Sequence, residues 1–278
     1  MTKRKALGQH FLTNRPILGK IIAVIDPRED ELIIEVGPGK GALTFPLARR
    51  CGRLIAIEKD PALIPGLLEK KPENVVILEQ DILETDFSGL LRRERGPGGP
   101  VKVVGNLPYS ISTPFLFRLL EQQGPVSKGV FLLQKEVAER VAAGPGSKKR
   151  APVSILFELD FRVRLHFTVS PGAFSPPPRV QSALVSLEKR ESPLFAVEDR
   201  EAFRRFLRSA FAERRKTLTN NLKRLGLAAD AVKRSLAAAS LNDTIRAEQV
   251  DLGRFVELFK LLRAPLPESA PGGIKQAT

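Results

Sequence analysis

The sequence predicts an α/β protein in which a mostly parallel sheet is followed by a small all-α domain. Between residues 31 and 188, short runs rich in β-branched residues alternate with helical patterns. Beyond residue 198, only helical patterns remain. Strands that alternate with helices form a parallel sheet covered by helices on both faces.

Seven segments carry the strand pattern. The first five are separated by about ten to fifteen residues each, enough for crossover helices, so we expect parallel strands. The last two are joined by a proline-rich loop alone, so we expect one of them to be antiparallel. The predicted strands span residues 31–36, 53–57, 74–78, 101–104, 129–133, 163–169 and 182–187.

The carboxyl-terminal part of the chain reads as helices. Apolar residues recur there at the i, i+3, i+4, i+7, i+8 spacing of a helix with one buried face. They are Phe203, Phe206, Leu207, Ala210 and Phe211, and further helices are expected over 218–225, 231–239 and 255–262. The sequence therefore predicts a first domain over 1–190, a helical domain over 199–264, and a disordered tail over 265–278.

The chain is strongly basic and has one cysteine. Its 278 residues include 45 Lys and Arg against 31 Asp and Glu, giving a net charge of +14 and a pI near 10.2. This balance is typical of proteins that bind nucleic acid or an anionic membrane surface. Cys51 has no second cysteine to pair with, which fits a reducing compartment. With only His10 and His166 beside it, we expect no metal site.

No segment reads as a membrane anchor. No run approaches the roughly 18 apolar residues that span a bilayer. The basic amino terminus is not followed by the unbroken apolar stretch of a signal peptide. We therefore expect a soluble, cytoplasmic protein that acts as a monomer.

The first strand runs into a glycine-rich turn that contains Gly37, Gly39 and Gly41. Glycines there let the backbone turn tightly and approach a ligand at the start of the next helix. Glu58 ends the second strand, 21 residues past Gly37, where a carboxylate meets the hydroxyls of a ribose. The pattern favours a cofactor with a nucleoside part; a nicotinamide dinucleotide and a purely structural turn are the alternatives.

Asp81 and Ile82 follow the third strand. The carboxylate of Asp81 can accept a hydrogen bond from the amine of an adenine ring, on which Ile82 can pack. The alternative is that Asp81 caps the next helix, a position that Asp often fills. The sequence leaves both interpretations open.

The segment Gly105-Asn106-Leu107-Pro108-Tyr109 follows the fourth strand. The exocyclic amine of adenine is a poor nucleophile because its lone pair is delocalised into the ring. The Asn106 side-chain oxygen and the Leu107 carbonyl can each accept one amine hydrogen, which favours a pyramidal nitrogen with an exposed lone pair. Tyr109 can stack on the base. The alternative is an ordinary turn.

The chain resembles a known enzyme family to about residue 260. Its glycine turn and acidic residues resemble those of class I S-adenosylmethionine-dependent methyltransferases, which have a Rossmann-like sheet. Asn106-Leu-Pro-Tyr109 resembles the motif of the members that methylate amino groups of bases. Residues 8–12, 171–185 and 211–218 narrow the resemblance to the small-subunit ribosomal RNA adenine dimethyltransferases.

The resemblance implies S-adenosylmethionine as the cofactor. The expected cofactor-binding residues are His10, Leu12, Gly37, Gly39, Glu58, Asp81, Ile82 and Asn106. The family commonly has Asn where this chain has His10, whose imidazole titrates near neutral pH and can tune cofactor affinity. A solvent-exposed loop histidine is the alternative.

The resemblance also implies the catalytic residues, which are Asn106, Leu107, Tyr109 and Phe174. Phe174 lies where the family has an aromatic side chain against the second face of the target base. Stacking contributes about 1–3 kcal/mol per base. Tyr109 and Phe174 together can therefore offset the few kcal/mol needed to flip an adenine out. The alternative for Phe174 is a core residue.

Basic residues concentrate in the helical region. Between Arg200 and Arg224, nine Lys and Arg stand against two Glu, a net charge of +7. This density favours phosphate contacts over an ordinary solvated helix face. Two basic loops add to it, and we expect the second to border the active site. The predicted RNA-binding residues are Lys3, Arg4, Lys5, Lys148, Lys149, Arg150, Arg204, Arg205, Arg208, Arg214, Arg215, Lys216, Lys223 and Arg224.

The resemblance implies methyl transfer to N6 of two adjacent adenosines in the 3′-terminal hairpin loop of 16S rRNA, within the immature 30S subunit. The nearest alternative is a 23S rRNA adenine N6-methyltransferase of the resistance type. Members of that type usually have Ile at the Leu107 position and a different carboxyl-terminal domain. A non-catalytic RNA-binding assembly factor is the alternative from another class. A dehydrogenase is more distant, because no hydride-transfer site is evident.

Overall fold

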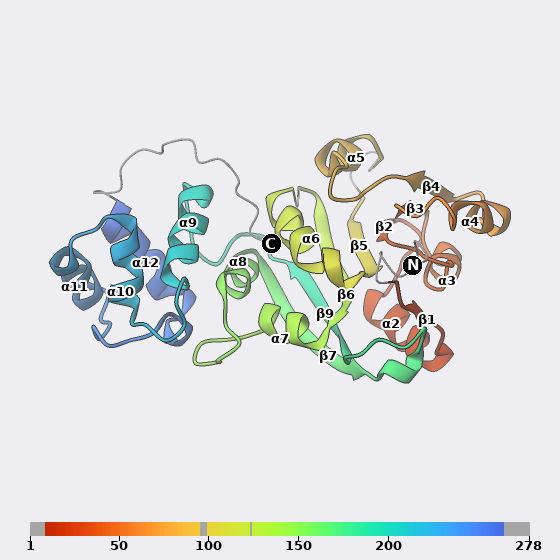
Figure 1. Cartoon of the computed structure of the whole chain (residues 1–278). Coiled ribbons are helices and arrows are strands. Elements are labelled where there is room, and N and C mark those ends of the chain that lie inside the picture. The colour runs from red at the N-terminus through yellow and green to blue at the C-terminus, as the bar shows by residue number, and fades with distance from the viewer. Residues whose placement is uncertain (1–8, 95–98, 123, 264–278) are drawn as a thin grey trace. The chain divides into compact units, whose positions relative to one another are not determined.

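The computed structural model describes residues 9–94, 99–122 and 124–263 (Figure 1). It divides into two compact units. The sheet unit is formed by the residues up to Ala143 together with Leu156–Leu194, and the helical unit by Gly144–Ile155 together with the residues from Phe195 onward. The predicted domain limits differ from this division at Gly144–Ile155, which groups with the helices. The amide of Gly146 donates to the carbonyl of Glu248 at 2.8 Å, which ties this segment to the helical unit.

The sheet unit is built on seven strands in the order β4-β3-β2-β5-β6-β9-β7. The first five in this order are parallel, and β9 lies antiparallel between β6 and β7. All seven predicted strands are therefore confirmed, and the antiparallel member of the last pair is β9. The strands are β2 (Leu32–Val36), β3 (Arg53–Glu58), β4 (Val75–Glu79), β5 (Val101–Asn106), β6 (Val126–Gln134), β7 (Phe161–Val169) and β9 (Ser182–Lys189).

Helices cover both faces of the sheet, as alternation along β6 shows. Val130 and Leu132 belong to one buried cluster with residues of α2 and α3. Phe131 points to the other face, where its ring lies 5.7 Å from that of Phe115 on α6. The helices before residue 199 are α2 (Arg15–Ile25), α3 (Thr44–Ala48), α4 (Ile64–Lys70), α5 (Phe87–Glu94), α6 (Tyr109–Glu121), α7 (Lys135–Val141) and α8 (Pro152–Asp160). The crossover helices predicted between the first five strands are thus present, and α2 is an addition.

A second, two-stranded sheet was not predicted. Strand β1 (Phe11–Leu12) pairs antiparallel with β8 (Phe174–Ser175), with Leu12 opposite Phe174. The amide of Thr13 donates to the carbonyl of Ala173 at 2.9 Å, which extends the connection. We call Gln9–Asn14 the amino-terminal strap, because this pairing fastens it to a segment far away in the sequence. Two residues per strand are too few to give a periodic pattern.

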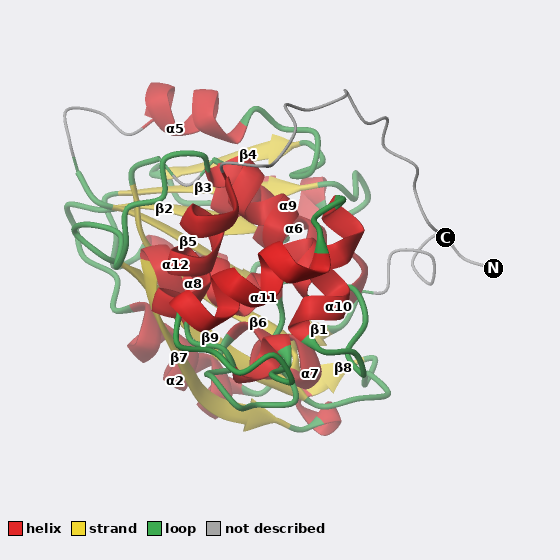
Figure 2. Ribbon diagram, turned by 90° about the vertical axis from the view of Figure 1, so that its left-hand side faces the viewer, coloured by secondary structure: helices red, strands yellow, loops and turns green. Residues whose placement is uncertain are grey.

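The helical unit confirms the all-α prediction for the carboxyl-terminal region (Figure 2). Its helices are α9 (Arg200–Ala210), α10 (Leu218–Leu222), α11 (Ala229–Ala238) and α12 (Leu252–Arg263). The rings of Phe203 and Phe206 on α9 pack against Phe259 on α12, at centroid distances of 5.2 Å and 5.6 Å. The apolar stripe read from the sequence is therefore the core of this unit.

Two predictions concern residues that the structure does not describe. Lys3, Arg4 and Lys5 lie outside the described residues, and so does the tail over 265–278. Within the described residues, no helix has both the length and the apolar character needed to cross a membrane.

Candidate active site

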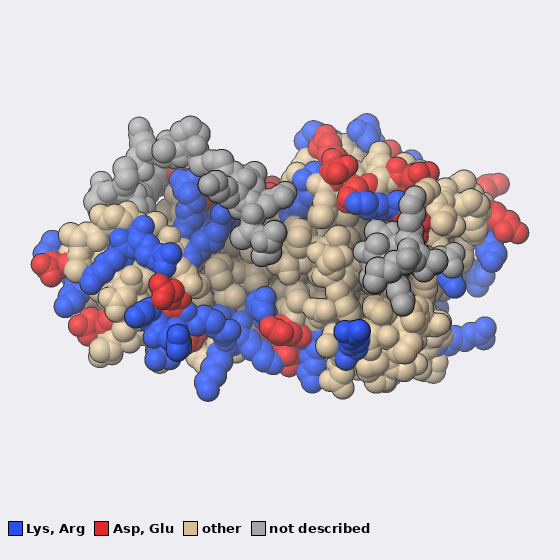
Figure 3. Space-filling view, viewed as in Figure 1, with Lys and Arg blue, Asp and Glu red and all other residues tan. Residues whose placement is uncertain are grey.

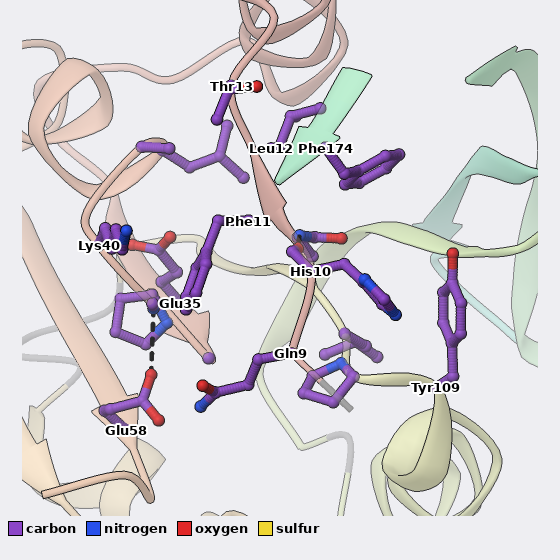
Figure 4. A pocket seen from close by; sticks show the side chains of 18 residues that line it. Gln9, His10, Phe11, Leu12, Thr13, Glu35, Lys40, Glu58, Tyr109 and Phe174 are labelled. Carbon is purple, nitrogen blue, oxygen red and sulfur yellow. Dashed lines mark hydrogen bonds between the residues drawn. The ribbon is translucent and has the colours of Figure 1, made fainter. Parts of the chain in front are cut away.

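The ends of three neighbouring strands form the candidate site. β3, β2 and β5 are adjacent and parallel, so their carboxyl ends lie side by side. Gly37 follows β2, Glu58 ends β3 and Asn106 ends β5. Ligands of open α/β sheets bind at such strand ends. Figure 4 shows the side chains that meet there.

Two cavities with shared walls occupy this end of the sheet. With the space open to solvent included, the first spans about 870 Å³ and the second about 670 Å³. Gln9, Gly37, Glu58 and Pro108 line both. Nine of the predicted residues line the first cavity, namely His10, Leu12, Gly37, Gly39, Glu58, Asn106, Leu107, Tyr109 and Phe174. Asp81 and Ile82 line the second. The fold thus gathers every predicted cofactor and catalytic residue around two adjoining cavities.

The glycine turn brings the backbone close to the amino-terminal strap. Gly39 has a φ of +59°, and a Cβ at this position would lie 3.0 Å from the ring of Phe11. A side chain would therefore be strained by its backbone angle and crowded against the strap. At this position of the cavity wall, glycine is the residue that fits without rearrangement of the strap.

Glu58 is fixed by two backbone groups. Its Oε2 accepts from the amide of Gly39 at 3.0 Å, and its Oε1 accepts from the amide of Asp60 at 2.9 Å. Burial raises the pKa of Glu58, and these hydrogen bonds oppose that rise. Each carboxylate oxygen accepts more than one hydrogen bond. Glu58 can therefore still accept from the hydroxyl groups of a ribose.

Asp81 both shapes its own turn and faces the second cavity. Its Oδ1 accepts from the amide of Leu83 at 2.9 Å, and its Oδ2 pairs with the Lys59 ammonium at 2.6 Å. Burial alone would raise the pKa of Asp81, but the hydrogen bonds from Lys59 and Leu83 outweigh it and lower the pKa. Asp81 therefore caps a turn through the Leu83 amide, whereas the alternative expected it to cap the next helix, which begins only at Phe87.

Glu35 is a site residue that the sequence prediction did not single out. It lines the first cavity, and its Oε2 is buried with no hydrogen-bond partner within the described residues. Burial, with a further contribution from the charge of Glu58, raises the pKa of Glu35 to about 7. The available signal was a carboxylate inside the otherwise apolar strand Leu32–Val36, directly before the glycine turn.

Gln9 is a second residue that the prediction missed. Its Nε2 donates to Asp60 Oδ2 at 3.3 Å, whereas its buried Oε1 has no partner in the described part of the chain. Buried polar atoms normally have hydrogen-bond partners. Gln9 and Glu35 thus present two acceptors that can take donors from a ligand. S-adenosylmethionine carries hydroxyl, amine and ammonium donors, so the site fits the predicted cofactor.

The strap also holds Asn106. The Asn106 Nδ2 donates to the backbone carbonyl of His10 at 2.9 Å. The His10 Nδ1 lies 2.8 Å from the carbonyl of Pro176, and since a carbonyl only accepts, Nδ1 carries a proton. His10 is partly buried and lines the first cavity. His10 is therefore a half-buried loop residue at the cavity, and its contact with the cofactor stays a prediction.

The two predicted stacking residues lie at the first cavity. The Tyr109 ring stands beside the His10 ring, with centroids 5.6 Å apart (Figure 4). Burial raises the pKa of Tyr109. Phe174 is 5% exposed and belongs to the buried cluster that includes Leu12 and Ile21. Phe174 therefore serves the core, as its alternative held, and also borders the cavity.

Lys and Arg gather on the face of the helical unit seen in Figure 3. Arg205 pairs with Glu201 at 2.9 Å, and Arg224 pairs with Glu213 at 2.8 Å. Within the described residues, no acidic partner is recorded for an exposed set of predicted cations that comprises Lys148, Arg208, Arg214, Arg215, Lys216 and Lys223. These six predicted cations are therefore available to an anionic partner.

Arg150 is the exception among the described cations of the RNA-binding prediction. Its side chain is 2% exposed, so the prediction that it contacts phosphate is wrong. A charged side chain beside Lys148 and Lys149 reads as part of one basic loop in the sequence. The fold instead turns Arg150 into the interior at the start of the segment that leads to α8.

Known proteins resemble this chain over most of its length. A small subunit methyltransferase A of Geobacter metallireducens is 45% identical over 265 residues, which cover 94% of this chain and 96% of the relative. One from Xanthomonas campestris pv. campestris is 40% identical over 257 residues, covering 92% of this chain and 94% of the relative.

Two solved structures of rRNA-modifying or adenosine-modifying enzymes also match this chain over most of its length. A dimethyladenosine transferase from Plasmodium falciparum matches with a TM-score of 0.74 at 25% identity, covering 92% of this chain and 98% of that one. The 23S rRNA methyltransferase ErmE matches with a TM-score of 0.69 at 25% identity, covering 91% and 99%. The family model for ribosomal RNA adenine dimethylase matches residues 1–264. The chain belongs to the ribosomal RNA adenine dimethylase family.

Proposed function

We propose that this chain transfers methyl groups from S-adenosylmethionine to N6 of two adjacent adenosines in the 3′-terminal hairpin loop of 16S rRNA, giving N6,N6-dimethyladenosines. The observation that carries the proposal is the anchored amide of Asn106, at a cavity that Tyr109 and Phe174 also line. Family membership and the 45% identity to a small subunit methyltransferase A support it.

The arrangement of the two cavities supports the choice of cofactor. Asp81 and Ile82 at the second cavity would hold the adenine, and Glu58, which lines both cavities, would hold the ribose. Glu35 and Gln9 would take donors from the amino-acid end in the first cavity. This order along the site matches the order adenine, ribose and methionine in the cofactor.

The cofactor supplies a methyl group bound to a positively charged sulfur. N6 of the target adenine forms a bond to the methyl carbon as the carbon–sulfur bond breaks, and the electron pair of that bond stays on sulfur. The nitrogen then carries a positive charge and releases one proton to water. Because this proton is acidic, the site needs no strong base. A second round on the methylated nitrogen gives the dimethyl product.

Asn106 and its neighbours orient the amine. Since Asn106 Nδ2 is engaged by His10, Oδ1 is the side-chain atom left to accept an amine hydrogen. The carbonyl of Leu107 accepts the other. Tyr109 and Phe174 hold the two faces of a base flipped out of the RNA, which stacking stabilises by about 1–3 kcal/mol per base. Positioning of this kind accounts for most of the rate enhancement that we expect.

The helical unit supplies RNA affinity in this proposal. Its exposed cations contact phosphates of the 30S subunit, in the cytoplasm, and the chain acts as a monomer. The alternative of a 23S rRNA methyltransferase has the structural match to ErmE in its favour. The 45% identical relative favours the small subunit.

The test is transfer of tritiated methyl groups from S-adenosylmethionine to undermethylated 30S particles, followed by nucleoside analysis and mapping of the modified positions. We expect N6,N6-dimethyladenosine at two adjacent positions of 16S rRNA. Naked 23S rRNA is assayed in parallel, and label in 23S rRNA with none in the 30S particles supports the alternative enzyme. Tight binding of 30S particles without any label supports a non-catalytic assembly factor and contradicts the proposal.

A further inference from the structure

A buried serine of the sheet holds the hydroxyl group of Tyr109. The Tyr109 phenol oxygen lies 2.9 Å from Ser182 Oγ. Ser182 is 1% exposed and begins β9, where it pairs with Gln134 of β6 on one side and with Val169 of β7 on the other. A residue paired on both sides is rigidly fixed. This hydrogen bond therefore ties the tyrosine ring to the sheet.

The ring is restrained from a second direction by His10. The two ring centroids are 5.6 Å apart at an angle of 40°. His10 is in turn fixed by its Nδ1 hydrogen bond to the carbonyl of Pro176. Tyr109 follows Pro108 and is the first residue of α6. No earlier turn of this helix packs against the tyrosine side chain. Contacts at the hydroxyl and at the ring face thus determine where the ring points.

We propose that Ser182 is a positioning residue for methyl transfer, whose hydroxyl holds the Tyr109 ring at the angle on which the target adenine stacks. Ser182 does not line either cavity and acts through Tyr109 alone. The inference rests on the proposed function, because it takes the base to lie against Tyr109. Fixing the ring before the base arrives removes an ordering cost from the step that flips the base.

The composition of the chain makes this inference directly measurable. Tyr109 is the only tyrosine, and the chain has no tryptophan. Near-ultraviolet absorbance at the phenolate band and tyrosine fluorescence therefore report on Tyr109 alone. Burial raises the pKa of this phenol, and the hydrogen bond with Ser182 lowers it. Removal of the serine hydroxyl must therefore move the titration of one identifiable group.

The variants are Ser182→Ala, Tyr109→Phe and the double substitution. Ser186→Ala is the matched control, because Ser186 lies on the same strand, is 2% exposed, and has its Oγ 2.8 Å from His166 Nε2, away from the cavities. Spectrophotometric titration of the full chain should give a higher phenol pKa in Ser182→Ala than in the native chain. Ser186→Ala should leave it unchanged.

Turnover on undermethylated 30S particles gives the second readout. One net hydrogen bond corresponds to a rate factor of about five to ten. We expect Ser182→Ala and Tyr109→Phe each to lower kcat by about that factor, while cofactor affinity stays within about twofold. The double variant should be no slower than either single variant, because both remove the same bond.

Three results would overturn the inference. One is native kcat in Ser182→Ala, another is a double variant whose losses multiply, and the third is an equal loss in Ser186→Ala. A native chain that labels no adenosine at all would overturn the proposed function, and the inference with it. The two kinds of failure are distinguishable, because only the second affects the native chain.

Discussion

The side-chain amide of Asn106 donates from Nδ2 to the backbone carbonyl of His10 at 2.9 Å. A carbonyl accepts and does not donate, so this contact fixes which way the amide points. Asn106 Oδ1 is thereby left as the free acceptor at the cavity. A residue of the amino-terminal strap thus sets the orientation of a residue 96 positions further along the chain.

This relationship predicts the outcome of two substitutions at Asn106. Asn106→Asp keeps the shape of the side chain but replaces the donor by an oxygen that repels the His10 carbonyl. Asn106→Ala removes both the donor and the acceptor. We expect each to lower turnover on undermethylated 30S particles by about 10²–10³-fold, the range for loss of one preorganised polar contact.

Single-turnover methyl transfer with saturating cofactor is the measurement, because it separates chemistry from cofactor binding. Far-ultraviolet circular dichroism of both variants serves as the folding control. Turnover of Asn106→Asp within about threefold of the native rate would show that the orientation of the amide is unimportant.

The strand pattern made the seven-stranded sheet predictable from the sequence. The small sheet of β1 and β8 was not predictable. Val-rich and Ile-rich runs such as Ile33–Val36 are long enough for the alternation of strands and helices to be visible in the sequence. The pairing of Phe11 with Ser175 is not. It joins two-residue strands through backbone hydrogen bonds, which leave no side-chain period. Yet this pairing carries the strap that holds Asn106.

The sequence also held too little information to assign individual charged residues to the site or to the surface. Motif spacing pointed to Glu58, because its place at the end of a strand, 21 residues past Gly37, is typical of cofactor sites. The family resemblance added Asp81, and both residues line the cavities. Glu35 was missed, although a carboxylate within a strand that is buried on both faces is costly without a ligand or a proton. Arg150 was misassigned for the opposite reason. Its neighbours Lys148 and Lys149 are exposed, and local sequence does not reveal that it alone turns inward.

The buried carboxyl of Glu35 predicts a specific pH dependence of stability. Its pKa rises from 4.5 to about 7 on folding, chiefly through burial. The native state therefore holds this proton more tightly than the unfolded state. Stability that is present at pH 4.5 is lost as the pH rises through about 7, by about 3 kcal/mol. Glu35→Gln removes this titration and should flatten the profile.

Guanidinium unfolding of the cofactor-free chain at pH 5 and pH 8 measures the effect. The native chain should lose about 2–3 kcal/mol more than Glu35→Gln between these values. Glu73→Gln is the control, since Glu73 is exposed. Identical pH profiles for the native chain and Glu35→Gln would mean that this carboxyl is not desolvated.

Asp81 predicts a loss of cofactor affinity that leaves the fold intact. Asp81→Asn keeps an oxygen that accepts from the Leu83 amide, so the turn survives. It removes the charge that makes Asp81 a strong acceptor for an amine. Hydrogen bonds to charged groups are about 1.5–3 kcal/mol each, so calorimetry should give S-adenosylmethionine affinity about 10–100-fold weaker. Glu79→Gln, an exposed residue at the end of β4, should bind as the native chain does.

The exposed cations of the helical unit predict steep salt dependence of RNA binding. If six to ten of them meet phosphates, affinity for 30S particles falls about 10³–10⁵-fold between 50 and 200 mM salt. The turn Arg214–Lys216 has three exposed cations, and none of these has a recorded acidic partner among the residues that the structure describes. Replacing all three by Glu should reduce the slope of log affinity against log salt by about three.

The same charge reversal at Lys70 and Lys71, which are exposed at the end of α4 in the sheet unit, should leave the slope unchanged. Equal slopes for both variants would mean that the phosphate contacts lie elsewhere, because counterion release counts only the cations that touch the backbone.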